Sequence, residues 1–404
     1  MADGAVWKRT LLPHGGLSSL KEKIAIIGAS DFQNPLIVKA KEMGLETHVF
    51  AWSDGSIGER TADFFYPISI TEIDKIASVC EEVGVSGICS IGTDLGNITV
   101  ASVANKLGLV ANTVECVRRS TNKHLMRMTF EQNGDPSPWS YEVRSVADAM
   151  TLPLSYPLIV KPVDRSGSRS ITKLVSNCGL EDAVQAAIDV SFDGAAVIEE
   201  FITGEEYSVE FLSWRGRHTF LALTKKYTTG APAFIETGHL EPAPVPEELR
   251  SAIYGVVSHA LDGLGVEYGA SHAEVLVTQG GEIEIVEIGS RMGGDCIGSD
   301  LVPLSTGIDF MRAVIDVSLG REPDLTPHDC KGNALIRFLF SEDDLSVLDG
   351  LRKRRSHLLS RYSVAEDLNR KIVDSSTRHG FFILSAENIN DLRAYVPAGE
   401  NGNA

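Results

Sequence analysis

Cysteine, cationic charge and long apolar runs are all scarce in this sequence, and each scarcity excludes a class of protein. The six cysteines are scattered and no two form a C-x-x-C pair, so neither a disulfide framework nor a zinc site is predicted. No apolar run reaches the length needed to span a bilayer, and the first 20 residues lack the apolar core of a secretion signal. We therefore expect a cytoplasmic protein without a membrane partner.

The shortage of positive charge argues against binding to nucleic acid. The formal net charge is -18, whereas general nucleic-acid binding rests on a cationic surface. The one dense basic run, from Arg352 to Arg355, is interpreted as a solvated helix face. The chain has 404 residues, of which 43% are hydrophobic, which is enough for two or three domains with a sizeable core.

Two common nucleotide-binding motifs are missing as well. Gly28-Ala-Ser30 follows a predicted strand, but the G-x-G-x-x-G pattern is absent, which disfavours a dehydrogenase. The Walker A pattern G-x-x-x-x-G-K-[ST] occurs nowhere. A nucleotide would have to be held by other residues.

The sequence does contain a regular alternation of strands and helices between residues 21 and 113, which predicts a parallel sheet with helices on both faces. Its strands are expected at residues 23–28, 46–51 and 87–90, and its helices near residues 35–43, 70–83 and 97–107. Further along, strands are expected at residues 156–163, 195–202 and 378–384, a helix at residues 180–189, and a long loop at residues 225–246. Ile91-Gly-Thr-Asp94 follows a strand and is either a small-molecule contact at the sheet edge or a plain turn with a helix cap.

Glu274 and Glu287 are the most informative residues. They lie in two β-prone runs separated by Gly280-Gly281, a two-residue hairpin signal. If these glycines form the turn, Glu274 faces Glu287 with Cβ atoms about 4.5–5.5 Å apart. Opposed like charges are destabilising, so a divalent cation between them is expected; two solvated glutamates are the alternative. The same register places Ile283 and Ile285 on the glutamates' face, and Gly289 opposite His272.

Two other segments suit a nucleotide, although each has an ordinary alternative. Lys161 ends a strand and is followed by Ser166-Gly167-Ser168, which is either a phosphate-binding loop or a plain surface loop. The strand at residues 195–210 breaks at Thr203-Gly204, so its exposed end offers backbone groups to a flat heterocycle; a hairpin with a charged turn is the alternative. Arg291 lies in a glycine-rich loop and supplies a cation for an anion.

The order of these parts closely resembles the ATP-grasp superfamily, in particular its branch of amino-acid ligases and carbamoyl-phosphate-synthase-like proteins. The resemblance rests on a helix-borne lysine, the strand lysine with its Gly/Ser loop, V-I-E-E-F-I-x-G-x-E-Y-S-V, H-A-E, and E-x-x-x-R-x-G-G. It covers residues 23–320, and residues 331–404 resemble that branch's small C-terminal lobe. It implies an α/β and α+β fold: an ATP-grasp fold with a doubly wound parallel-sheet domain at the N-terminus. The domains expected are an arm (1–20), the parallel-sheet domain (21–113), the ATP-grasp domain (114–325, with a small mobile lobe at about 130–200) and a C-terminal lobe and tail (326–404).

The resemblance also implies the ligands and a role for individual residues. ATP and magnesium, with manganese as an alternative, are the implied cofactors. Phosphates would be bound by Lys123 and Lys161 under a loop of Ser166, Gly167 and Ser168. Adenine would be held by Glu199, Glu200, Phe201 and Ile202, and ribose by Glu206. Magnesium would be bound by Glu274 and Glu287, and catalysis would fall to Lys226 and Arg291. Substrate contacts would come from Glu236, His239, His272, Gly293 and Gly294.

One position departs from the family pattern. The family often has asparagine two residues after the second glutamate, as a further metal ligand, whereas this chain has Gly289. His272 or water is the expected partial substitute.

The function implied is an ATP-dependent carboxylate–amine ligase that works through an acyl phosphate, with small-molecule carboxylate and amine substrates. One alternative keeps the fold but activates bicarbonate, as carboxylases and carbamoyl-phosphate-synthase-like enzymes do. Another is a nucleotide-binding protein without ligase activity, which has no need for the glutamate pair and Arg291 together. A homodimer is expected by analogy only.

Overall fold

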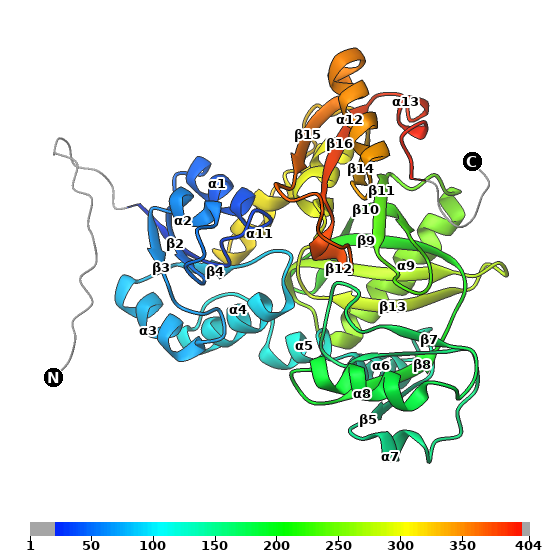
Figure 1. Cartoon of the computed structure of the whole chain (residues 1–404). Coiled ribbons are helices and arrows are strands. Elements are labelled where there is room, and N and C mark those ends of the chain that lie inside the picture. Colours follow the sequence, from blue (N-terminus) through cyan, green and yellow to red (C-terminus); the bar gives the residue numbers. More distant parts are fainter. Residues whose placement is uncertain (1–20, 398–404) are drawn as a thin grey trace, which may run out of the picture.

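Three β-sheets organise the computed structural model, which describes residues 21–397 (Figure 1). The predicted N-terminal arm at residues 1–20 and the end of the predicted tail, residues 398–404, lie outside the described residues. The mixed α/β fold class is confirmed, since parallel and antiparallel sheets occur together. Within residues 21–397 no helix is both long and apolar enough to cross a membrane.

The first sheet is parallel, as predicted, and has the strand order β3-β2-β1-β4. Ile24 and Ile26 of β1 enter one apolar core while Ala25 and Ile27 enter another, which is why this strand is apolar almost throughout. The strands are β1 (Lys23–Ile27), β2 (Glu46–Phe50), β3 (Phe64–Tyr66) and β4 (Gly87–Cys89). The helices are α1 (Asn34–Glu42), α2 (Ile57–Thr61), α3 (Ile73–Val83) and α4 (Asp94–Leu107).

The second sheet is antiparallel, has the order β5-β8-β6-β7 and lies within the predicted small lobe. Helices α7 and α8 share an apolar core with its strands. The strands are β5 (Ser140–Val143), β6 (Leu158–Pro162), β7 (Thr172–Leu174) and β8 (Ala196–Glu200). The helices are α7 (Val146–Ala149) and α8 (Leu180–Val190), and α5 (Val114–Arg119) and α6 (Lys123–Asn133) precede the sheet in the chain.

The third sheet has eight antiparallel strands in the order β13-β12-β9-β10-β11-β14-β16-β15. The strands are β9 (Glu205–Trp214), β10 (Arg217–Thr228), β11 (Glu236–Glu241), β12 (Tyr268–Val277), β13 (Ile283–Gly289), β14 (Asn333–Phe338), β15 (Leu359–Val364) and β16 (Gly380–Ala386). The proposed boundary after residue 325 falls just before β14, and the strands beyond it continue this sheet through the β11–β14 ladder.

Helices cover the third sheet and connect its strands. Helix α9 (Glu247–Leu264) packs on the core beneath β9, β12 and β13. The remaining helical segments are the π-helix at Ile297–Leu301, α10 (Val302–Thr306), α11 (Phe310–Ser318), α12 (Glu342–Arg354), the 3-10 turns at Ser356–Leu358 and Ser375–Thr377, and α13 (Asn390–Arg393).

The prediction of a long loop at residues 225–246 is wrong. Strand β10 continues to Thr228 and β11 occupies Glu236–Glu241, so only residues 229–235 separate them. The richness in Gly, Pro and Thr suggested a loop, yet His239 and Glu241 are 1% and 0% exposed. Their polarity reflects a buried polar environment next to a cavity rather than contact with solvent.

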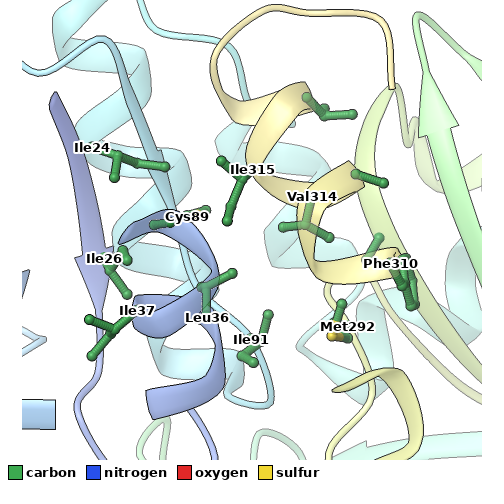
Figure 2. Packing of buried hydrophobic residues seen from close by; sticks show 14 of the residues in the cluster. Ile24, Ile26, Leu36, Ile37, Cys89, Ile91, Met292, Phe310, Val314 and Ile315 are labelled. Atoms are coloured by element: carbon green, nitrogen blue, oxygen red, sulfur yellow. The ribbon is translucent and has the colours of Figure 1, made fainter. Parts of the chain in front are cut away.

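The first sheet is fixed to the third by one apolar core. Ile24, Leu36 and Ile91 of the N-terminal part share it with Phe310 of α11 and with Met292. Figure 2 shows Met292 and Ile91 side by side between α11 and the first sheet. The loop after β13 is therefore anchored in the core that joins the two parts.

Candidate active site

Glu274 and Glu287 pair across β12 and β13, as predicted. Near the turn, however, Val277 pairs with Ile283 and Val275 with Ile285, so the turn has three residues, 279–281. A β-bulge after Glu274 then shifts the register by one residue and brings the two glutamates opposite each other. Because of this bulge Ile285 points into the core with Val275, and the prediction that Ile283 and Ile285 share the glutamates' face is wrong.

A cavity of about 1440 Å³ contains the glutamate pair. Its lining comes from the second sheet, the third sheet and the edge of the first, so all three parts meet there. Ligand cavities usually measure about 300–1,000 Å³, so this one has room for a nucleotide and a second molecule. Of the predicted site residues, the cavity is lined by Lys123, Lys161, Ser166, Gly167, Ser168, Glu199, Glu200, Phe201, Ile202, Glu206, Lys226, Glu236, His239, His272, Glu274, Glu287, Arg291 and Gly294.

Gly293 is the exception, because it does not line the cavity. Its N–H donates to Glu210 at 3.4 Å, and a Cβ at this position would lie 2.6 Å from Nδ1 of His272. The prediction that Gly293 contacts substrate therefore lacks support from its position. Glycine is required there because the chain passes close to a buried ring.

Lys161 is held by a buried ionic cluster. Its Nζ lies 2.7 Å from Oε2 of Glu199, and Nε of Arg127 lies 3.0 Å from the other oxygen of that carboxylate. Burial alone would raise the pKa of Glu199, but Arg127 and Lys161 outweigh it and hold the pKa at about 2. Glu199 is 1% exposed, so its side chain acts as a counter-charge that orients Lys161. Its predicted contact with adenine stays a prediction.

Lys226 lies between two predicted ligand-binding glutamates. Its Nζ is 2.6 Å from Oε1 of Glu274 and 2.8 Å from Oε1 of Glu206. Burial alone would lower the pKa of Lys226, but the carboxylates raise it well above its ordinary value, so the side chain is a fixed cation. On β10, rather than on a loop, this cation has a rigid position.

Lys123, the first residue of α6, plays the matching part at Glu287. The two charged groups are 3.2 Å apart, and the ammonium also donates to the carbonyl oxygen of Arg165 at 2.9 Å. Lys123 thus joins Glu287, a predicted metal ligand, to the loop after β6. Each glutamate of the pair has its own buried lysine, which removes the repulsion that the sequence predicted.

His272 is packed between two carboxylates. Its Nδ1 bonds to Glu210, and its Nε2 lies 3.5 Å from Oε1 of Glu274. Burial alone would lower the pKa of His272, but Glu210 and Glu274 raise it to about 9. Both ring nitrogens of His272 thus face carboxylates, and its role as a metal ligand in place of the family's asparagine stays a prediction.

The predicted phosphate loop, residues 166–168, contacts the link between β10 and β11. Ser168 donates its hydroxyl to the carbonyl oxygen of Phe234 at 2.9 Å, across the cavity from β6. Phe201 lies under Lys173, whose Nζ is 3.8 Å from the ring centroid, and residues 201–204 form the link between β8 and β9. The segment proposed for adenine is therefore also the connection between the second and third sheets.

A charged group that contains Asp295 and Arg378 also lines the cavity. Both carboxylate oxygens of Asp295 bond to Arg378, and His239 lies 3.5 Å away. The hydroxyl of Ser375 donates to Glu236. The predicted substrate residues Glu236 and His239 thus lie together, among groups of both signs.

Several residues at the site were not predicted. Arg127 had a readable signal, since it lies four residues after Lys123 and therefore on the same face of α6. Glu210 directly follows the V-I-E-E-F-I-x-G-x-E-Y-S-V motif but was given no role, whereas Arg378 had no signal because it lies far from the motifs in sequence. Asp94, predicted to lie in either a small-molecule contact or a plain turn with a helix cap, contacts Arg291: its Oδ1 is 2.8 Å from Nε of the arginine.

Comparison with known proteins agrees with this geometry. Residues 154–299 match the ATP-grasp domain family. The chain is 25% identical over 352 residues to alanine–anticapsin ligase of Bacillus subtilis (strain 168). This alignment covers 78% of this chain and 73% of that protein. It also resembles the crystal structure of an L-amino acid ligase from Bacillus licheniformis, with a TM-score of 0.79 and 24% identity over 94% of this chain and 96% of that one.

A more distant likeness has the same architecture. The biotin carboxylase domain of the Hydrogenobacter thermophilus 2-oxoglutarate carboxylase, solved with magnesium ADP and bicarbonate, gives a TM-score of 0.72 at 16% identity. It covers 93% of this chain and 90% of that chain. At such identities the structural likenesses establish the fold.

Proposed function

We propose that this chain, an ATP-grasp protein by virtue of the domain at residues 154–299, is an ATP-dependent ligase that joins a carboxylate to an amine. The observation that carries this proposal is the convergence of Glu274 and Glu287 with three buried lysines in one cavity. The relatives' names point the same way, because both an alanine–anticapsin ligase and an L-amino acid ligase join amino acids. Amino acids are therefore the first substrates to test.

ATP would lie with its base on residues 200–202 and its phosphates between Lys123, Lys161 and the loop at residues 166–168. These groups line the same cavity, and the lysines are already oriented by Glu287 and Glu199. Preorganised cations stabilise the charge that develops when a phosphoryl group is transferred. Lys226 would serve the same purpose at the γ-phosphate, since Glu274 and Glu206 hold it in place.

The glutamate pair fits magnesium by its donor chemistry. Carboxylate oxygens are the hard ligands that this ion prefers, and burial does not protonate Glu274, because Lys226 and His272 hold its pKa well below the ordinary value. Among residues 21–397 no group of three or more His, Cys, Asp or Glu side chains is arranged to bind a metal alone. The other ligands would be phosphate oxygens and water, which is how magnesium commonly binds. When bound, the ion would neutralise phosphate charge; manganese in its place stays a prediction.

The chemistry has two steps. A carboxylate oxygen of the first substrate attacks the γ-phosphorus of ATP, the bond to ADP breaks, and an acyl phosphate forms. The nitrogen of the second substrate then attacks the acyl carbon, phosphate leaves, and the nitrogen gives up a proton. Arg291 lines the cavity next to the glutamates and would stabilise the negative charge that builds up on oxygen.

A phosphate-release assay tests this function. The protein is incubated with ATP and magnesium, and L-amino acids are supplied singly and in pairs. We expect release that depends on a pair, and a hydroxamate when hydroxylamine replaces the amine. Glu287→Gln should lower release at least about 100-fold, whereas substitution of the exposed Glu282 on the same hairpin by Gln should not. Release that depends on bicarbonate alone would identify a carboxylase, and ATP binding without release in any arm would contradict the ligase. Dimerisation and cytoplasmic location stay predictions.

A further inference from the structure

The loop that carries Arg291 is bonded to the N-terminal part of the chain at three successive residues. The side-chain amide of Asn97 donates to the carbonyl oxygen of Ser290 at 3.0 Å. The N–H of Gly92 donates to the carbonyl oxygen of Met292 at 3.2 Å. Between them, Nε of Arg291 donates to Oδ1 of Asp94 at 2.8 Å. Met292 is buried in the core shared with the first sheet (Figure 2), so the backbone on either side of the arginine is fixed.

The guanidinium group lies close against the backbone at Gly289. A Cβ on Gly289 would be 3.1 Å from Cζ of Arg291 and 3.3 Å from its Nη1. The arginine is therefore folded back over the backbone at the position where the family pattern has asparagine. This placement depends on Gly289 and leads the Nε edge of the group toward Asp94.

Only one edge of the guanidinium is occupied. The ion pair uses Nε, and Nη1 is buried with no hydrogen-bond partner among residues 21–397. A buried donor without a partner is costly unless a ligand satisfies it. Since Arg291 lines the cavity, the group that would satisfy it is an anionic or polar atom of a bound substrate.

We propose that Asp94 is a positioning residue for Arg291: its carboxylate holds Nε above Gly289 and leaves the Nη atoms for the reacting substrate. The inference rests on the proposed role of Arg291 in the ligase reaction. It makes the N-terminal sheet part of the catalytic machinery, because Asp94 is the first residue of α4, directly after that sheet's last strand and turn. If the ion pair of Asp94 and Arg291 only held the N-terminal part against the loop after β13, it would not need to leave one edge of the guanidinium free.

Two substitutions displace the guanidinium by independent routes. Asp94→Asn removes the charge without changing the shape of the side chain, and Gly289→Ala places a methyl group against Cζ without touching Asp94. A displacement of about 1 Å in a catalytic group can cost about 100-fold in rate. We therefore expect Asp94→Asn to lose about 100-fold in kcat with the best amino-acid pair, and Gly289→Ala to lose less, because its methyl group requires the arginine to move by only a few tenths of an ångström. The KM for ATP should stay within threefold of wild type in both variants.

Lys39→Gln is the matched control. Lys39 forms a 2.9 Å ion pair with Asp309 across the same junction between the N-terminal part and α11, away from the cavity. We expect its kcat to equal that of wild type. Arg291→Lys combined with Asp94→Asn should be no slower than Arg291→Lys alone, because Asp94 acts only through the arginine. Additive losses, or an equal loss in Lys39→Gln, would overturn the proposal.

Thermal unfolding separates this inference from the proposed function. In a double-mutant cycle, Asp94→Asn and Arg291→Lys should lower Tm by less together than the sum of their separate effects. That coupling is measurable even in a chain that releases no phosphate with any substrate. A wild-type chain that releases no phosphate with any substrate but shows this coupling would reject the proposed function alone, and additive Tm changes would reject the positioning role.

Discussion

Glu241 offers a sharp test of the electrostatics next to the active site. It is fully buried on β11, accepts hydrogen bonds from Thr224 at 2.6 Å and from Ser305, and lies near the carboxylate of Glu210. Burial raises its pKa from 4.5 to about 7, against the effect of the two hydroxyl groups. Glu241 is therefore protonated in the folded protein at mildly acidic pH, where the unfolded chain has already lost that proton.

The direction of the pH effect follows from this difference in bound protons. Below pH 4.5 both states are protonated and Glu241 contributes no pH dependence. Between pH 4.5 and about 7 the folded state binds more protons than the unfolded state, so stability falls as the pH rises. Above pH 7 the whole difference is lost, which amounts to about 3 kcal/mol of unfolding free energy at about 1.4 kcal/mol per tenfold change in acidity.

Glu241→Gln removes the titration and keeps a neutral side chain of the same shape. Because hydroxyls both donate and accept, Thr224 and Ser305 can still bond to the amide. We expect wild type and variant to unfold at similar urea concentrations at pH 4.5, and the variant to be about 3 kcal/mol more stable at pH 8. Other titrating groups cancel in the comparison. Glu247→Gln, on an exposed side chain, should show no such divergence; parallel curves for Glu241→Gln and wild type would refute the assignment.

Two further predictions concern the cavity. Glu287→Gln should lower kcat at least about 100-fold and weaken its response to added magnesium, because it removes one of two paired ligands; an unchanged magnesium titration of phosphate release would contradict this. Lys161→Met should lower the unfolding free energy by about 3 kcal/mol, because it leaves the buried Glu199 with Arg127 alone, and should abolish binding of a non-hydrolysable ATP analogue. Urea unfolding and equilibrium titration measure the two effects, and undiminished binding of the analogue would remove Lys161 from the ATP site.

The pairing of Glu274 with Glu287 shows how a sequence pattern can lead to the right contact by the wrong route. A two-residue turn at Gly280-Gly281 and a regular ladder predict it. The actual turn has three residues, and a bulge after Glu274 restores the pairing. Bulges depend on the strand's neighbours and twist, which a single hairpin sequence does not reveal. The same bulge explains why Ile285 faces the core.

Local periodicity predicted the first sheet well, because its strands and helices are apolar on the faces that pack. It failed at β11, where a segment rich in Gly, Pro and Thr resembled a loop. Local periodicity could not predict contacts between distant segments: Arg378 and Asp295 are 83 positions apart, and Asp94 and Arg291 are 197 positions apart. Such pairs follow from the topology of the sheets and not from any spacing along the chain.

The link at residues 201–204 has a mechanical consequence. The third sheet is one continuous ladder from β13 to β15, so the wall of the cavity that holds the glutamates belongs to a single hydrogen-bonded sheet. The second sheet meets it in the chain at residues 201–204, where Gly204 passes so close to Val277 that a Cβ would lie 2.5 Å from the carbonyl oxygen. The mobility of the lobe at about residues 130–200 stays a prediction; if the second sheet turned about this link, a base bound at residues 200–202 would lie near the axis, where displacement is smallest. The phosphates, beneath the loop at residues 166–168, would lie farther from this axis. Closure of the second sheet would therefore displace the groups around the phosphates more than those around the base.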